Sequence, residues 1–319
     1  MKKIAYIYNI NNKYSYAAKT VANGFKNAFI DRQDSFRFFD LEKLQYSFWP
    51  GEKLKLINYA PDIIFASVEN LPYIPLKLLK STSLVLWGAF YSACDYEPQI
   101  HTLSEDIKQR LNKYSDKHNI LIWSQHDESI NEQFFSGYKR ELGLKFTQLL
   151  HCADKTMFTK PVVNPEFDFI WVGNIGHRVS TYKSFIIPFK EAFNNFLEYS
   201  EHNMINPATI ERKQYYARSF ITPNIHTEAQ IKYNILLNER VFTSSMMGGF
   251  QICDNILARE LFTEDELIIA TKSEDFLEKA HYYISHPDER MKMITKMQEN
   301  ISNNHTYFNR IDKILENLG

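Results

Sequence analysis

Short apolar runs, each followed by a polar loop and a stretch with helical periodicity, recur along the first half of the chain. We predict strands here at residues 3–9, 35–39, 62–68, 84–87 and 119–124. Helices are predicted at 14–29 and 131–143. The strands are apolar on both faces, which is typical of a parallel sheet covered by helices on both sides. The first loop lacks the glycine pattern of a dinucleotide site, so no such cofactor is expected there.

The same alternation of elements starts again after a polar stretch that contains Pro161 and Pro165, which indicates a domain boundary. Strands are predicted at 167–172, 220–225, 250–253 and 267–270. Helices are predicted at 180–199, 207–218 and 273–284, then from 286 onward and at 308–318. Ser180, Thr181 and Ser273 are candidate N-caps. The pattern predicts a second Rossmann-like domain.

Residues 238–255 read NERVFTSSMMGGFQICDN: a helix, two glycines, a short strand and a polar tip. The apolar side of this helix comprises Val241, Phe242, Ser245 and Met246. Glycines let a backbone approach a phosphate closely, and ligands gather at the carboxyl ends of parallel strands. The pattern therefore fits a nucleotide-binding wall. A helix that ends at a glycine C-cap before an ordinary core strand fits it as well.

Composition indicates a soluble globular protein, with 44% hydrophobic and 24% charged residues. The length of 319 residues favours two domains. Lys and Arg total 37 against 38 for Asp and Glu, so the net charge of −1 gives no case for a nucleic-acid partner. The aromatic content of 15% suits stacking on sugars or bases, although core filling explains most rings.

The three cysteines, Cys94, Cys152 and Cys253, are far apart and form no Cys/His cluster. Neither a zinc site nor a disulfide framework is therefore expected, and reduced thiols fit a cytoplasmic protein. The asparagines after residue 8 interrupt the first apolar run, so we expect no signal peptide. No apolar stretch is long enough to span a membrane, and a peripheral membrane contact is left open.

The turn at residues 173–178 is the first phosphate candidate, because it lies where a strand leads into a helix. Its members are Gly173, Asn174, Gly176, His177 and Arg178. An ordinary strand-to-helix turn explains the same pattern. Asn238 and Arg240 form a second polar group, for which a solvated surface arginine is the alternative.

Polar residues also follow several predicted strands. His126 and Asp127 follow the fifth strand, and a histidine in such a place can move a proton near neutral pH. Glu69 follows the third strand and is the candidate general base, while His226 follows a strand in the second half. An exposed loop residue is the alternative for both histidines.

The second half resembles the carboxyl-terminal region of GT-B glycosyltransferases of the CgeB-like, family-1 type. The likeness rests on NERVF, GGFQICDN and ARELF between residues 238 and 262, flanked by PNIH, YYISHPDER and HTYFNR. WVGNIGHR resembles the first strand and loop of a donor domain, and IWSQHDES in the first half resembles the histidine loop of related enzymes.

The resemblance implies an α/β protein of the GT-B fold, with two Rossmann-like domains facing each other across a cleft. It implies an acceptor domain at 1–162, a nucleotide-sugar donor domain at 163–304, and a helix at 305–319 that packs back on the first domain. The donor diphosphate would meet the 173–178 loop, Arg240 and the amides of Gly248 and Gly249. Base and ribose would lie near Asn238, Asp254 and Asn255, with His226 beside them.

The family usually has Glu five residues before the first glycine of the pair, where it is assigned to the donor ribose. Here that position is Thr243, and the position eight earlier, Ile235, is not acidic either. The resemblance therefore leaves three outcomes: Thr243 bonds the ribose itself, the nucleotide is held differently, or activity has been lost.

We predict a bacterial glycosyltransferase that moves a sugar from a nucleotide diphosphate, most simply a UDP-sugar, to a glycan or glycoconjugate. In it, His126, Asp127 and Glu69 are the candidate catalytic residues. No metal is expected, because fixed N–H groups and arginine can stabilise the leaving diphosphate and no Asp-x-Asp motif occurs. The rival interpretations are an inactive nucleotide- or sugar-binding protein of the same fold and a nucleotide-sugar epimerase.

Overall fold

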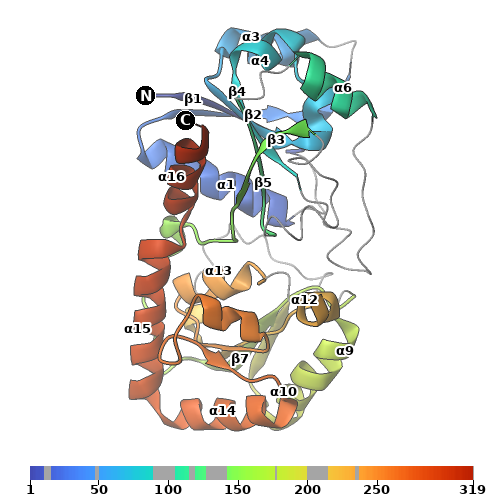
Figure 1. Cartoon of the computed structure of the whole chain (residues 1–319). Helices are drawn as coiled ribbons and strands as arrows, with labels where there is room; N and C mark the ends of the chain where they lie inside the picture. Colours follow the sequence, from blue (N-terminus) through green and yellow to red (C-terminus); the bar gives the residue numbers. More distant parts are fainter. Residues whose placement is uncertain are drawn as a thin grey trace. The chain divides into compact units, whose positions relative to one another are not determined.

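The computed structural model describes most of the chain and is drawn in Figure 1. The described residues are 1–10, 16–46, 50–88, 105–114, 119–126, 142–176, 178–199, 215–233 and 237–318. The predicted helices at 131–143 and 207–218 fall almost entirely outside these residues.

The chain forms two compact α/β units. The first comprises Met1–Ala93, Glu97–Leu150 and Tyr307–Gly319, and the second comprises His151–Thr306. The chain thus returns to the first unit for its last helix. The domain limits expected at residues 162 and 304 stay predictions, since compactness alone does not decide where a functional domain ends.

A six-stranded parallel sheet forms the centre of the first unit, in the order β2-β1-β3-β4-β5-β6. Its strands are β1 (Lys3–Tyr8), β2 (Ser35–Asp40), β3 (Ile63–Ser67), β4 (Ser83–Trp87), β5 (Ile120–Ser124) and β6 (Lys145–Gln148). The first five confirm the strands predicted from the apolar runs. The edge strand β6 was not predicted.

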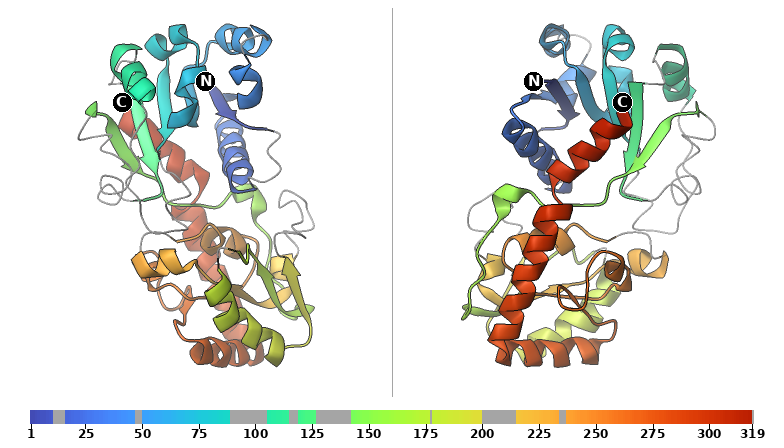
Figure 2. Two further views of the ribbon diagram at one scale, coloured as in Figure 1. Left: turned by 90° about the vertical axis from the view of Figure 1, so that its right-hand side faces the viewer. Right: turned by 60° about the vertical axis from the view of Figure 1, so that its left-hand side comes forward.

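Helices cover both faces of this sheet, which agrees with the burial of successive residues in its central strands. One face packs against α2 (Leu41–Gln45), α3 (Pro50–Tyr59), α4 (Leu76–Ser81) and α6 (Glu105–Tyr114) through an aliphatic core. The other face carries α1 (Tyr16–Asp31) and α16 (Tyr307–Leu318), which lie side by side (Figure 2). The predicted return of the last helix to the first domain is therefore confirmed.

Gly24 allows α1 and α16 to approach each other closely. A Cβ atom at this position would overlap the ring of Tyr307, which is 5% exposed. The same ring packs edge-on against Phe25, at 5.0 Å between centroids. A glycine in the middle of α1 is thus required by the contact that holds the last helix.

The second unit contains a five-stranded parallel sheet in the order β11-β10-β9-β7-β8. Its strands are β7 (Phe167–Val172), β8 (Phe196–Tyr199), β9 (Ser219–Asn224), β10 (Gln251–Cys253) and β11 (Ile268–Ile269). The helix predicted at 180–199 is wrong in its last part. There the helical stretch ends at Ala192, and β8 follows as an edge strand.

The helices of the second unit begin with a continuous helical stretch made of α9 (Val179–Thr181), a π-helical turn (Tyr182–Ile186) and α10 (Ile187–Ala192). Later come α12 (Glu228–Tyr233), α13 (Arg240–Met246), α14 (Ser273–Ser285) and α15 (Pro287–Asn304). Pro287 occupies the first turn of α15, where its missing N–H costs nothing. Ser273 is not the N-cap of α14, because Lys272 holds that position and the Ser273 hydroxyl donates to the Ser184 carbonyl.

We predict that Gly24→Ala destabilises the first unit by about 1–3 kcal/mol, because the added methyl group overpacks the contact with Tyr307. Helix propensity alone would give the opposite sign, a gain of up to about 1 kcal/mol. Urea unfolding of the full chain, followed by circular dichroism, measures the change. In a Tyr307→Leu background the same substitution should be neutral or stabilising; a stabilised Gly24→Ala single variant would contradict the contact.

Candidate functional site

The carboxyl edge of the second sheet brings together side chains from three separate parts of the chain. Gly173 follows β7, His226 lies two residues after β9, and Asp254 follows β10. Because these strands are parallel and adjacent, their carboxyl ends meet at one edge. The start of α13 lies at the same edge, as its hydrogen bonds to the ends of β7 and β9 show.

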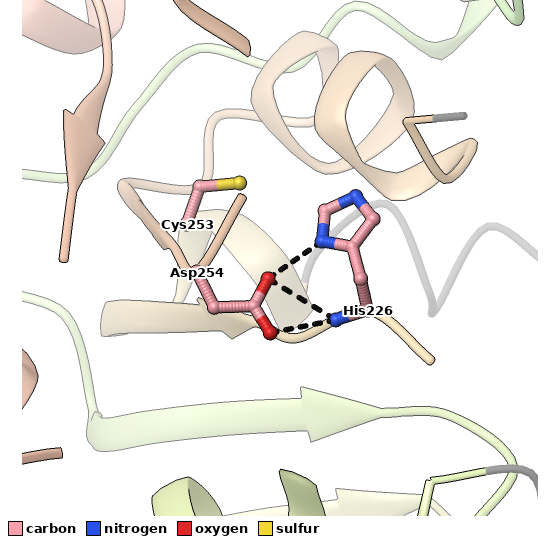
Figure 3. Close-up of side chains that lie close together, drawn as sticks. All are labelled: His226, Cys253 and Asp254. Carbon is pink, nitrogen blue, oxygen red and sulfur yellow. Dashed lines mark hydrogen bonds and ion pairs between the residues drawn. The ribbon is translucent and has the colours of Figure 1, made fainter. Parts of the chain in front are cut away.

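His226 and Asp254 form a fully buried pair (Figure 3). Nδ1 of His226 lies 2.6 Å from Oδ1 of Asp254, and the backbone N–H of His226 donates to both carboxylate oxygens. On the other side of the ring, the backbone N–H of Asn238 donates to Nε2 at 3.1 Å. A nitrogen that accepts cannot carry the proton, so the neutral ring has its proton on Nδ1 and donates it to Asp254.

Burial lowers the pKa of His226, and the nearby guanidinium groups of Arg240 and Arg178 lower it further. The carboxylate of Asp254 acts in the opposite direction but does not outweigh burial. The imidazole is therefore neutral at physiological pH, as it must be for Nε2 to accept a hydrogen bond from the backbone N–H of Asn238.

Arg240 joins the ends of two strands. Its Nη1 donates to the carbonyl of Val172 at the end of β7, and its Nη2 donates to the carbonyl of Ile225, 2.7 Å away, just after β9. The backbone N–H of Arg240 donates to Oδ1 of Asn238 at 3.1 Å. The guanidinium is thus fixed at the carboxyl edge.

Behind Arg240 runs a ladder of buried amide side chains that the sequence did not reveal. Nδ2 of Asn238 donates to Oδ1 of Asn224 at 2.8 Å, and Nδ2 of Asn224 donates to Oε1 of Gln251 at 2.7 Å. Gln251 in turn donates to the Val241 carbonyl on α13. The sequence signal for this ladder was weak: Asn224 is the last residue of β9, and Gln251 is the first residue of β10.

The turn after β7 places Gly173 against Arg240. A Cβ at Gly173 would lie 2.8 Å from Nη1 of Arg240 and 2.8 Å from the ring of Trp171, so only glycine fits here. Asn174 accepts from Nη1 of Arg178 through its carbonyl, at 3.1 Å. Gly176 lies in the same turn, and His177 is outside the described residues.

Ser180 and Thr181 do not cap the helix that follows this turn, which corrects the prediction. The helix begins at Val179, and Arg178 occupies the N-cap position without a side-chain cap. The hydroxyl of Thr181 instead donates to the carbonyl of His226 at 3.0 Å, and so ties the helical stretch to the His226 backbone.

Gly248 and Gly249 lie at the opposite edge of the sheet from His226. A Cβ at Gly248 would meet Ala217, just before β9, and one at Gly249 would meet Thr222. Their amides donate to the Ser245 and Ser244 carbonyls, both at 2.9 Å, and Gly248 has a φ of +80°. The two glycines directly follow Met247, the C-cap of α13, and end the helix, as in the alternative interpretation. The amides expected to bind a diphosphate are therefore already used by carbonyls of the helix.

Thr243 is buried in the middle of α13, 8% exposed. Its hydroxyl donates to the Glu239 carbonyl one turn earlier, at 3.2 Å. All six residues from Val241 to Met246 are buried, so the helix buries its polar side, with Thr243 and Ser244, as well as the predicted apolar side.

The candidate catalytic residues of the first unit lie at the carboxyl edge of its own sheet. His126 follows β5 and is buried, with its backbone N–H donating to Oγ of Ser124 at 3.1 Å. Glu69 is exposed in a 3-10 helix, Val68–Tyr73, after β3. Asp127 lies outside the described residues.

His226, Cys253 and Asp254 offer ligand atoms within 4.8 Å of one another, a spacing that a metal ion could use (Figure 3). The hydrogen bonds argue against such a site. A metal on Nδ1 would put the proton on Nε2, where it would face the N–H of Asn238. Burial also raises the pKa of the Cys253 thiol, whereas a metal needs the thiolate. These residues fit a hydrogen-bonded pair better than a metal centre.

Two buried donor atoms near this edge have no hydrogen-bond partner within the described part of the chain. They are Nε1 of Trp171, on β7, and Nδ2 of Asn255, after β10. The other side-chain atom of Asn255, Oδ1, accepts from the backbone N–H of Leu257 at 3.0 Å. Unsatisfied buried donors are uncommon in folded proteins, and a bound ligand is one of their explanations.

Comparison with known families shows which family the second unit resembles. A profile described as glycosyl transferase-like matches residues 157–316, half of the chain and nearly all of the second unit. The chain belongs to this family. The predicted enzyme class, a glycosyltransferase, is confirmed, and so is the resemblance stated for the second half.

Solved structures of similar fold cover the whole chain at low identity. Sucrose-phosphate synthase from Thermosynechococcus elongatus has a TM-score of 0.61 at 10% identity, over 100% of this chain and 99% of that chain. HepE from Anabaena, solved with UDP-glucose, has a TM-score of 0.55 at 11% identity, over 99% and 100%. An alpha-glucosyltransferase solved with UDP and a 13-mer DNA has a TM-score of 0.59 at 11% identity, over 99% of each chain.

These similar structures confirm the GT-B fold that was predicted for this chain. No curated protein sequence matches the chain. Within the described residues, none of the helices has the length and apolar character needed to cross a membrane.

We predict that the second unit loses stability as the pH falls below about 6.5, the pKa of histidine in an unfolded chain. The folded pKa of His226 is lower, so the unfolded state takes up the proton first. One such proton changes stability by at most about 1.4 kcal/mol per pH unit. Hydrogen exchange of β9 and β10 between pH 7.5 and 5.5 measures this slope.

The slope should be smaller in a His226→Gln variant. His281→Gln, which replaces an exposed histidine of the same unit, is the matched control and should keep the slope of the natural chain. Equal slopes in the natural chain and His226→Gln would show that His226 is not the group responsible.

Proposed function

We propose that the second unit binds a nucleotide-diphosphate sugar, most simply a UDP-sugar, at the carboxyl edge of its sheet. The enzyme then transfers the sugar to a glycan or glycoconjugate. The observation that carries the proposal is the placement of two guanidinium groups, Arg178 and Arg240, around the buried His226, at the ends of β7 and β9. Fixed cations of this kind stabilise the charge that develops on a departing diphosphate.

The ligands of similar structures agree with this choice of donor. HepE was solved with UDP-glucose, and the alpha-glucosyltransferase was solved with UDP. The unsatisfied donors on Trp171 and Asn255 lie near the same edge and would suit a ligand rich in oxygen acceptors. Asn238, His226 and Asp254 complete the proposed donor site, together with Gly173, which leaves room for Arg240.

Three predicted residues are left out of this site. Gly248 and Gly249 cap α13 at the other edge, and the hydroxyl of Thr243 bonds within its own helix. The proposed ribose contact therefore does not depend on Thr243. In the first unit, His126 and Glu69 remain the proposed catalytic candidates on the acceptor side, together with Asp127.

We further propose that the reaction is metal-independent, because arginine side chains take the place that a cation holds on the diphosphate. The His226–Asp254 pair would not serve as a metal site, since both ring nitrogens are hydrogen-bonded.

We predict that Arg240→Lys weakens UDP binding about tenfold or more, because a lysine cannot span both carbonyls as the guanidinium does. Calorimetric titration with UDP in a buffer containing EDTA measures the affinity and tests metal independence at once. The expected result is binding by the natural chain in EDTA.

Arg290→Lys is the matched control. Arg290 is a buried arginine of the same unit that donates to two backbone carbonyls, those of Tyr283 and Val163. Its replacement lowers stability but should leave UDP affinity unchanged. Equal affinity of Arg240→Lys and the natural chain would remove Arg240 from the site, and binding that requires a divalent ion would overturn metal independence.

We propose that the first unit contacts an anionic membrane surface through the helices α2, α3 and α4, together with Tyr46, which directly follows α2. Tyr46, Leu54 and Leu76 are 61%, 52% and 44% exposed there. Exposed lysines flank them, at positions 43, 55, 77 and 80, although the chain as a whole carries a charge of −1. Exposed apolar side chains among lysines suit the interface of an anionic bilayer.

We predict that the natural chain sediments with phosphatidylglycerol vesicles more than with phosphatidylcholine vesicles. The double variant Leu54→Ser/Leu76→Ser should lose most of this binding. Ile30→Ser is the control, because Ile30 is also 52% exposed but lies on α1, on the other face of the sheet. Equal binding by the double variant and the control would rule out this surface.

A further inference from the structure

A chain of hydrogen bonds connects Asp254 with Arg240. Arg240 is proposed to bind the diphosphate, whereas Asp254 is not. Asp254 accepts from Nδ1 of His226, and Nε2 of His226 accepts from the backbone N–H of Asn238. The side chain of Asn238 then accepts from the backbone N–H of Arg240. The first two steps cross between elements, from the end of β10 to the end of β9 and on to Asn238, and the third leads into the start of α13.

We propose that Asp254 and His226 are positioning residues for the donor site, and that they hold Arg240 in place only while the imidazole carries its single proton on Nδ1. The proposal rests on the donor site proposed above. It assigns Asp254 to the control of the tautomer, rather than to the base or ribose contact that the family resemblance implies.

The geometry leaves one tautomer that satisfies every group. With the proton on Nε2, that N–H would face the N–H of Asn238, and the bare Nδ1 would face the carboxylate of Asp254. With both nitrogens protonated, Asp254 would gain but Asn238 would still face a donor. Full burial of His226 and Asp254 prevents water from making up for either loss.

The charged and titratable groups around His226 come from every neighbouring element. Asp254 and the thiol of Cys253 belong to β10 and its end, Arg240 belongs to α13, and Arg178 precedes α9. Asp254 favours the protonated ring, while both arginines oppose it. A bound diphosphate would bring negative charge to the arginines, yet the acceptor role of Nε2 would still require the neutral ring.

Asp254→Asn is the decisive variant, because it keeps the shape and can still accept from the His226 backbone N–H. Its amide nitrogen would then donate to Nδ1 and drive the ring proton to Nε2. Nitrogen-15 NMR of the full chain with labelled histidines should show the Nδ1–H tautomer for His226 in the natural chain and the Nε2–H tautomer in this variant. UDP affinity, measured by calorimetry at pH 7.5, should fall about tenfold.

Two further variants separate positioning from simple folding. Asp154→Asn changes another buried aspartate of the same unit, which accepts from the Thr156 N–H at 2.9 Å, and should leave UDP affinity unchanged. His226→Gln supplies an acceptor near Nε2 that cannot be protonated. It should retain more affinity for UDP at pH 7.5 than Asp254→Asn.

The two proposals can fail separately. If the natural chain does not bind UDP, the donor site is wrong, and the tautomer measurement still tests the positioning of Asn238. If UDP binds and Arg240→Lys weakens it, while Asp254→Asn leaves both the tautomer and the affinity unchanged, the positioning role is overturned.

Discussion

The second unit depends on how the carbonyls at the ends of β7 and β9 are satisfied. The pairing of these strands runs from Phe167↔Ser219 to Phe169↔Ile221, and Pro223, beyond it, has no N–H to donate. Buried carbonyls still need donors, and Arg240 supplies two from one rigid fork. Hydrogen bonds that involve a charged group contribute about 1.5–3 kcal/mol each, so they fix the start of α13 against the sheet.

This constraint explains several sequence features at once. Gly173 follows from it, since a side chain there would displace Arg240. The constraint also explains Asn238. Its Oδ1 accepts from the backbone N–H of Arg240, and its Nδ2 donates to Oδ1 of Asn224 and to the carbonyl of Ile225. Arg240 thus has two roles. It satisfies the carbonyls of Val172 and Ile225, and in the proposed function the same guanidinium also binds the diphosphate.

The sequence predicted the strongly apolar strands and the long helices, because both carry a clear period. It missed β6 and β8, whose sequences KFTQ and FLEY are short, partly polar and at the edges of their sheets. Such strands are stabilised by one neighbour and by tertiary contacts that no local pattern encodes. For this reason the helix predicted at 180–199 wrongly included the residues of β8.

Within the site, adjacency of parallel strands was enough to bring His226 and Asp254 together, and the family motif pointed to Arg240. The order of the sequence already puts Gly248 and Gly249 before β10, and therefore at the amino edge of a parallel sheet, opposite Asp254. Seven residues of α13 rise about 10 Å, which is about the length of three strand residues, so the helix carries the chain from one edge of β10 to the other. Thr243 lies halfway along, buried, where a carboxylate would need a partner of its own and a threonine hydroxyl can use the backbone of its own helix.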